Sequence, residues 1–198
     1  MQCGFIIRPD YEFLTPVISE WIACIDKYAR WHDGGDLPYW YNERANVSVL
    51  TGAAWRANFV ALEEYQVDKF KETAPNGKSL GRNDLYLSSE EESLCIEAKV
   101  CYPNMANTAE SKTCIEAAIG VASSDAKNLR GDVEEKLGAV FVVPYSENKV
   151  ATNEQTNAFI AAVGGFQSPI KAWCFPSNAQ KIVGKYDRYC PGVALLIG

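Results

Sequence analysis

The sequence predicts an α/β domain with a mixed central sheet flanked by helices. Apolar residues recur at helical spacing in several segments, whereas three consecutive segments between residues 58 and 100 have the length and composition of strands. After one more helical segment, GAVFVVPY (138–145) is a continuous apolar run, typical of a strand that is covered on both faces. Helices and strands that follow one another in the order α–β–β–β–α–β, with additions at both ends, indicate an α/β fold.

The first helix is expected to begin at Thr15 and Pro16, which suit the N-cap and the first helical position. Val17, Trp21 and later apolar residues then recur at helical spacing. The segment WHDGGDLPYW (31–40) ends this helix, because its glycines and its proline favour a loop.

A second helix is expected over about residues 41–55. Val47, Leu50 and Ala54 form one apolar stripe along it. Glu43 lies four residues before Val47, so it extends the same stripe instead of facing water.

The next part of the chain predicts an antiparallel meander. NFVALEEYQVDKF (58–70) has the pattern of a long strand, and the loop KETAPNGKSLG (71–81) follows it. A short strand over 83–88, the polar turn SSEEE and a third strand over 93–100 complete the meander.

The rest of the chain is expected to alternate in the same way. Apolar residues trace one helical stripe from about 111 to 130, and Gly131 is expected to end that helix. The later expected elements are a strand at 138–145, a helix at about 153–163, and strands at 171–175 and 192–197.

Length and composition bound the class of protein. A chain of 198 residues with 47% hydrophobic and 22% charged residues fits a single globular domain, here taken as residues 1–198. No apolar run approaches the roughly 20 residues that span a bilayer, so no membrane segment is expected. The N-terminus, MQCGFIIRPDYEF, lacks a basic region followed by a long apolar stretch, so no secretion signal is expected either.

Cysteine, histidine and charge exclude several kinds of site. The seven cysteines include no CxxC pair and several lie in apolar patterns, which favours buried thiols in a reducing compartment and therefore the cytoplasm. His32 is the only histidine, so a three-histidine zinc site is excluded. A serine triad would depend on His32, which lies in a loop with no nucleophile elbow nearby. The net charge of −6 disfavours nonspecific binding to nucleic acid but leaves room for a basic channel on one face.

Charged residues interrupt two of the expected strands in GRNDLYLSSEEESLCIEAK (81–99). Because side chains alternate along a strand, Glu97 and Lys99 project from one face while the apolar residues between them face the other way. Asp84 begins the partner strand, and the tight turn between the strands brings its carboxylate close to that of Glu97.

Two converging carboxylates repel each other, and a divalent cation relieves that repulsion. Carboxylates, carbonyl groups and water are the ligands that Mg²⁺ prefers. A neighbouring lysine can hold a water molecule or a phosphate oxygen as charge develops. The combination of Asp84, Glu97 and Lys99 therefore predicts metal-assisted cleavage of a phosphodiester.

The pattern GRNDLYL…CIEAK resembles that of the PD-(D/E)XK phosphodiesterase superfamily, which has the restriction-endonuclease-like fold. The resemblance covers about residues 41–145 and implies a core of helix, three-stranded meander, second helix and further strand. It also implies that Asp84 and Glu97 are metal ligands and that Lys99 is the catalytic lysine. Asn83 stands where the family name has a proline.

The superfamily often adds a glutamate from the first core helix, and Glu43 occupies that place. Glu63 and Glu64 on the first strand are rival candidates, of which only one can face the site because neighbours on a strand point to opposite faces. Arg82, just before the expected metal ligand, could contact a phosphate, although an arginine in a loop is commonly just solvated.

The resemblance implies a Mg²⁺-dependent nuclease, with Mn²⁺ as a substitute, that acts on nucleic acid, with DNA expected ahead of RNA. Two alternatives stay open. One is a catalytically inactive protein of the same fold that serves as a binding or inhibitory partner in a defence or repair assembly, which an acidic surface would suit. The other is a generic α/β interaction domain. A homodimer and a protein partner are both compatible with the sequence.

Overall fold

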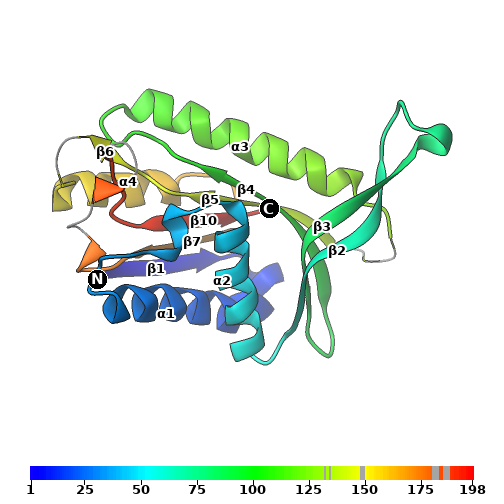
Figure 1. The fold of residues 1–198 in the computed structure, drawn as a ribbon, viewed down its shortest axis with the longest axis horizontal. Coiled ribbons are helices and arrows are strands. Elements are labelled where there is room, and N and C mark those ends of the chain that lie inside the picture. Colours follow the sequence, from blue (N-terminus) through cyan, green and yellow to red (C-terminus); the bar gives the residue numbers. More distant parts are fainter. Residues whose placement is uncertain (132, 134, 148–149, 180–182, 185–187) are drawn as a thin grey trace.

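The described part of the chain is organised around a seven-stranded mixed sheet with helices on its two faces (Figure 1). The structure is a computed structural model of residues 1–198, and it describes all of them except 132, 134, 148–149, 180–182 and 185–187. Among the described residues, the α-helices are α1 (Thr15–Trp31), α2 (Glu43–Arg56), α3 (Thr108–Asn128) and α4 (Asn153–Gly164).

The described strands of the central sheet are β1 (Gln2–Ile7), β2 (Val60–Phe70), β3 (Lys78–Ser88), β4 (Ser93–Cys101), β5 (Glu135–Val142), β7 (Ile170–Phe175) and β10 (Val193–Ile197). A small second sheet contains β6 (Ser146–Glu147), β9 (Arg188–Tyr189) and β8 (Val183–Gly184). Short 3₁₀ helices cover Pro9–Leu14, Pro38–Trp40 and Pro75–Gly77.

The strands of the central sheet lie in the order β1-β7-β10-β5-β4-β3-β2. Strands β4 and β5 are parallel, and α3 makes the crossover between them, while the other neighbouring strands pair antiparallel. The α/β class with a mixed central sheet is therefore confirmed. Along the chain, α2, the meander β2–β3–β4, α3 and β5 follow one another in the expected order.

Two apolar layers hold the helices to the sheet. Trp21 of α1 and Leu50 of α2 pack with Ile96 of β4 in the larger layer. Ile115 of α3 and Phe159 of α4 belong to the smaller layer, on the other face. Burying one such side chain contributes about 1.5–3 kcal/mol, so these stripes determine which face of each helix meets the sheet.

Helix α2 begins where the chain supplies a cap. The side chain of Asn42 accepts a hydrogen bond from the backbone N–H of Ala45, which satisfies one of the free donors of the first turn. Glu43 thereby becomes the first helical residue, next to the positive end of the helix dipole. Val47 and Leu50 lie on the buried side of the helix, as expected from their spacing.

Strand β3 is longer than expected, because residues 78–81 belong to it and not to the preceding loop. Lys78 pairs with Phe70, and the register continues without a break through Gly81 and Val67. Backbone hydrogen bonds make this pairing and need no apolar side chains, so the polar segment carried no strand pattern. Strand β1 was also not expected; it pairs antiparallel with β7 at the edge of the sheet.

Strands β2 and β3 project beyond the helices as a long two-stranded extension (Figure 1). We call residues 65–83 the β2–β3 arm. No helix in the described ranges is long and apolar enough to cross a membrane.

Candidate functional site

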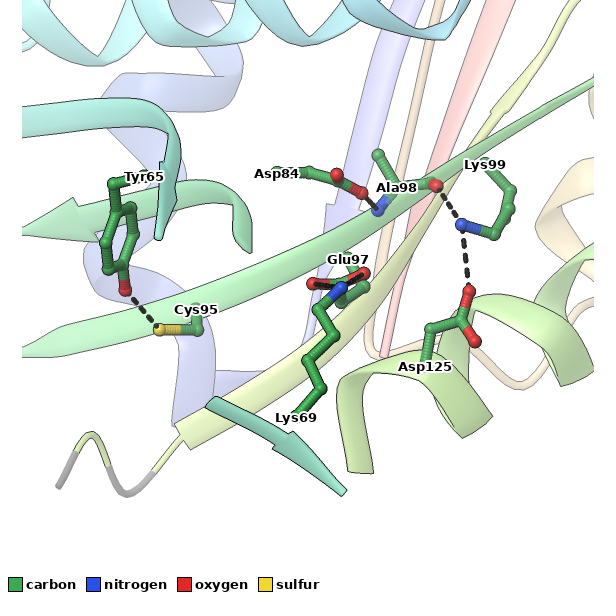
Figure 2. Close-up of polar contacts among 8 residues, drawn as sticks. All are labelled: Tyr65, Lys69, Asp84, Cys95, Glu97, Ala98, Lys99 and Asp125. Carbon is green, nitrogen blue, oxygen red and sulfur yellow. Dashed lines mark hydrogen bonds and ion pairs between the residues drawn. The ribbon is translucent and has the colours of Figure 1, made fainter. Parts of the chain in front are cut away.

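The candidate site lies where β3 and β4 stop pairing. The ladder between them runs from Ser88 and Ser93 to Leu85 and Ile96 and goes no further. Asp84 is the next residue of β3, and its Oδ2 accepts a hydrogen bond of 2.7 Å from the backbone N–H of Ala98 (Figure 2). The carboxylate of Asp84 thus satisfies a backbone donor of β4, which holds it at the edge of that strand.

Glu97 projects from β4 into a buried position, with only 2% of the residue exposed. The Lys69 ammonium donates a hydrogen bond of 2.8 Å to its Oε2 and lies 2.7 Å from its Oε1. Within the described residues, Oε1 accepts no well-directed hydrogen bond, so its contact with Lys69 is an ion pair. Burial raises the pKa of Glu97, and so does the charge of Asp84, while the hydrogen bond from Lys69 lowers it; the net shift is upward.

Lys69 reaches Glu97 from the β2–β3 arm, across the position of Gly81. A Cβ at residue 81 would lie 2.8 Å from the Cδ of Lys69, so the absence of a side chain there gives the lysine its path. The arm is also tied to the end of α3, because the backbone N–H of Arg130 donates a 2.8 Å hydrogen bond to the carbonyl of Asp68.

Lys99 is held by a different partner, on α3. Its ammonium donates to the carbonyl of Ala98 at 2.8 Å and forms an ion pair of 3.0 Å with Oδ2 of Asp125 (Figure 2). Burial lowers the pKa of Lys99, but the hydrogen bond to Asp125 and the negative charges of Glu43, Asp125 and Asp84 together outweigh it, so the pKa lies above its usual value. Lys99 is therefore positively charged at neutral pH.

Glu43 lies half-buried at the start of α2, near the same group of charges. Burial raises its pKa and the charge of Lys99 opposes that effect, while the charges of Asp84 and Asp125 add to it. The fold thus brings Glu43, Asp84 and Glu97 into one electrostatic neighbourhood with Lys99, although Asp84 and Glu97 are each held by a separate partner.

The two rival glutamates of β2 have other surroundings. Glu63 lies opposite Leu85 in the ladder between β2 and β3. Glu64 forms ion pairs with Arg44 at 3.0 Å and with Arg82 at 3.3 Å. Glu64 lies across from Asp84 between the pairs Glu63–Leu85 and Tyr65–Asn83, so it borders the site.

Lys69 of β2, like Asp125 of α3, belongs to the site although no sequence pattern predicted it. Its alternation along β2 predicts only which face of that strand it lies on, and β3 separates β2 from β4 in the sheet. The one signal in the sequence is Gly81, which could have indicated a close approach to the strand surface.

Asp84 and Glu97 are suitable donors for a divalent cation, but the site is not a preformed cage. In the described part of the chain, no three acidic, histidine or cysteine side chains are grouped so that they could hold a metal ion. Mg²⁺ is commonly bound by one or two carboxylates, with waters and substrate phosphates as further ligands. The buried Oε1 of Glu97 fits such a role, provided that the ammonium of Lys69 moves away from it.

A cysteine beside the site is unsuited to nucleophilic chemistry. The hydroxyl of Tyr65 and the sulfur of Cys95 lie 3.3 Å apart in hydrogen-bond contact (Figure 2). Burial raises the pKa of the Cys95 thiol, which disfavours the reactive thiolate. Cys95 is therefore a buried thiol in contact with Tyr65 and is assigned no catalytic role.

No family model, curated protein or solved structure matches the chain. The function of the site is therefore inferred from its own residues. Three features determine what the site can do: the carboxylates of Asp84 and Glu97, the charged Lys99, and the hydrogen bond and ion pairs that hold them.

Proposed function

We propose that the protein is a metal-dependent nuclease that hydrolyses phosphodiester bonds in nucleic acid, with DNA expected ahead of RNA, on a core of the PD-(D/E)XK type. The observation that carries this proposal is the placement of Asp84, Glu97 and Lys99 where β3 and β4 separate. The order of α2, the meander β2–β3–β4, α3 and β5 supports it, because it is the order that the resemblance implies.

In this proposal Asp84 and Glu97 hold Mg²⁺ or Mn²⁺, and Glu43 contributes from the start of α2. The bound cation supplies stabilisation of the negative charge that develops on the phosphate. Asp84 keeps its place because it also accepts the hydrogen bond from Ala98, so its position does not depend on the cation.

Lys99 has the role of orienting the attacking water and stabilising charge near the phosphate. Its raised pKa keeps it protonated, so it acts as a hydrogen-bond donor and not as a general base. Asp125 positions the ammonium by the 3.0 Å ion pair.

The alternative, a catalytically inactive binding or inhibitory partner, is supported by a different observation. Both carboxylate oxygens of Glu97 lie within 2.8 Å of the Lys69 ammonium, which is a self-contained ion pair that needs no cation. The net charge of −6 suits a basic protein partner better than nucleic acid.

Cleavage assays together with thermal unfolding distinguish these two functions. The purified protein should cut DNA or RNA in Mg²⁺ or Mn²⁺ and stop in chelator, and the cation should raise its melting temperature. Asp84→Asn should lose both effects and still fold, because the amide oxygen can accept the hydrogen bond from Ala98. The matched control is Asp68→Asn, an exposed acid of the β2–β3 arm, which should retain both.

An inactive protein gives a different pattern. It cuts no nucleic acid, and its melting temperature stays flat up to tens of millimolar cation. That result would reject the nuclease proposal in favour of the binding partner.

A further inference from the structure

Glu64 has an unusual backbone conformation in the middle of strand β2. Among the 11 residues of that strand, all of them described, it alone has a positive φ, of 53°. The neighbouring pairs, Glu63 with Leu85 and Tyr65 with Asn83, keep the register on both sides of it. A left-handed conformation costs a residue other than glycine about 1–2 kcal/mol.

The carboxylate of Glu64 lies between two arginines from different elements. Nη2 of Arg44, on α2, is 3.0 Å from Oε1 of Glu64, and Nη1 of Arg82, on β3, is 3.3 Å from Oε2. The two arginine side chains are 65% and 64% exposed. Exposed ion pairs contribute about 0–1 kcal/mol each, which does little more than offset the backbone strain, so stability does not account for this arrangement.

The position of this group relates it to the candidate site. Arg44 follows Glu43 in the first turn of α2, and Arg82 lies two residues before Asp84 on β3. In the ladder between β2 and β3, the pairs Glu63–Leu85 and Tyr65–Asn83 flank Glu64 and Asp84, so Glu64 lies across from the proposed metal ligand. The two guanidinium groups therefore border the place where the proposed reaction would occur.

A carboxylate and a phosphodiester present similar oxygen pairs to a guanidinium group. We propose that Arg44 and Arg82 form a binding subsite for a backbone phosphate of nucleic acid, next to the phosphate that is cleaved, and that Glu64 occupies this subsite until the phosphate displaces it. This inference rests on the proposed nuclease function. Two arginines and Glu64 carry a net charge of +1, so a phosphate finds an attractive pair only once the carboxylate turns away.

Equilibrium binding in chelator tests the subsite without interference from cleavage. The probes are a labelled DNA duplex and a labelled RNA strand, titrated at several salt concentrations. Arg44→Gln and Arg82→Gln should each weaken binding about threefold to tenfold and lower the magnitude of the salt slope by about 1. Glu64→Gln should tighten binding several-fold, because it removes the competing charge and keeps the size of the side chain.

The matched control is Arg56→Gln. Arg56 lies at the other end of α2 in a similar exposed ion pair, 2.7 Å from Glu20, and its side chain is 53% exposed. Arg56→Gln should leave both the affinity for nucleic acid and the salt slope unchanged. Arg44→Lys should keep most of the salt slope and still lose affinity, because lysine cannot bind two oxygens at once.

Two results would overturn the subsite. The first is that Arg44→Gln and Arg82→Gln bind nucleic acid as tightly as Arg56→Gln does. The second is that Glu64→Gln binds nucleic acid more weakly than the wild type, as a direct contact of Glu64 with the substrate would require. If the wild type cuts nucleic acid normally in either case, the subsite alone is wrong. If the wild type neither binds nor cuts nucleic acid, the proposed function fails and the subsite with it.

Discussion

Lys69 on β2 and Glu97 on β4 form a short, buried ion pair although β3 lies between their strands in the sheet. The ammonium lies 2.7 and 2.8 Å from the two carboxylate oxygens, and only 2% of the Glu97 side chain is exposed. The pair joins the β2–β3 arm to the candidate site. It also places a positive charge where the proposed cation would be bound.

Replacing Lys69 by methionine should destabilise the protein in the absence of metal. The substitution leaves a buried carboxylate without its partner, and the free energy of unfolding should fall by about 1–3 kcal/mol, less than for a fully buried pair. The lysine side chain is 25% exposed, which reduces the effect. Urea unfolding in chelator measures it.

The control for this substitution is Lys78→Met, which removes an exposed ion pair of 3.4 Å with Asp68 on the same arm and should change the stability by under about 1 kcal/mol. Lys69→Met should also bind Mg²⁺ more tightly, because the cation no longer competes with an ammonium. Equal destabilisation by the two substitutions, or weaker Mg²⁺ binding by Lys69→Met, would contradict this account of the pair.

Gly81→Ala should act through Lys69. The new Cβ would meet the Cδ of Lys69 at 2.8 Å and push the lysine away from Glu97. We expect a loss of about 1–2 kcal/mol of stability, as for other overpacked positions. In a Lys69→Ala background the same substitution should cost much less, since the obstructed side chain is gone. Additive losses would show that Gly81 serves another purpose.

Lys99→Ala should reduce cleavage severely while the fold is retained. Loss of a donor that acts mainly in the transition state lowers kcat by about a hundredfold or more and changes KM little. Steady-state cleavage of a labelled DNA, combined with a thermal unfolding curve, measures both effects. Lys127→Ala, an exposed residue on the same helix as Asp125, is the control and should cleave like the wild type.

Tyr28 should make the stability of the protein sensitive to alkaline pH. Its hydroxyl donates a 2.7 Å hydrogen bond to Asp36, which raises the pKa of Tyr28 to about 12. The unfolded chain loses this proton near a pH of about 10. The folded state keeps it to a higher pH, so this contribution to stability is present below about pH 10 and is lost as the pH rises towards about 12.

Melting temperatures of the wild type and Tyr28→Phe across this pH range measure the effect. The advantage of the wild type should shrink as the pH rises, because a phenylalanine side chain has no proton to lose. A difference that stays constant with pH would show that the hydrogen bond to Asp36 does not control the titration.

The resemblance to a PD-(D/E)XK core came from features that are local in the chain. Glu97 and Lys99 lie two residues apart, and alternation along a strand alone places them on one face. Asp84 lies just beyond the ladder between β3 and β4, so a tight turn was enough to predict that it returns to β4. Helical periodicity likewise predicted α2 and α3 within a few residues of their observed bounds.

The side chains that these residues contact could not be predicted from local sequence patterns. Lys69 meets Glu97 across an intervening strand, and Arg44 meets Arg82 at Glu64 through three different elements. Such contacts depend on the twist of the sheet and on a left-handed residue inside a strand, neither of which leaves a repeating pattern in the sequence. The order of the elements and the faces of their side chains could be predicted from the chain alone, because backbone periodicity is a local property. Which charges neutralise one another became visible only in the folded molecule, because ion pairs form between groups that packing brings together from distant parts of the chain.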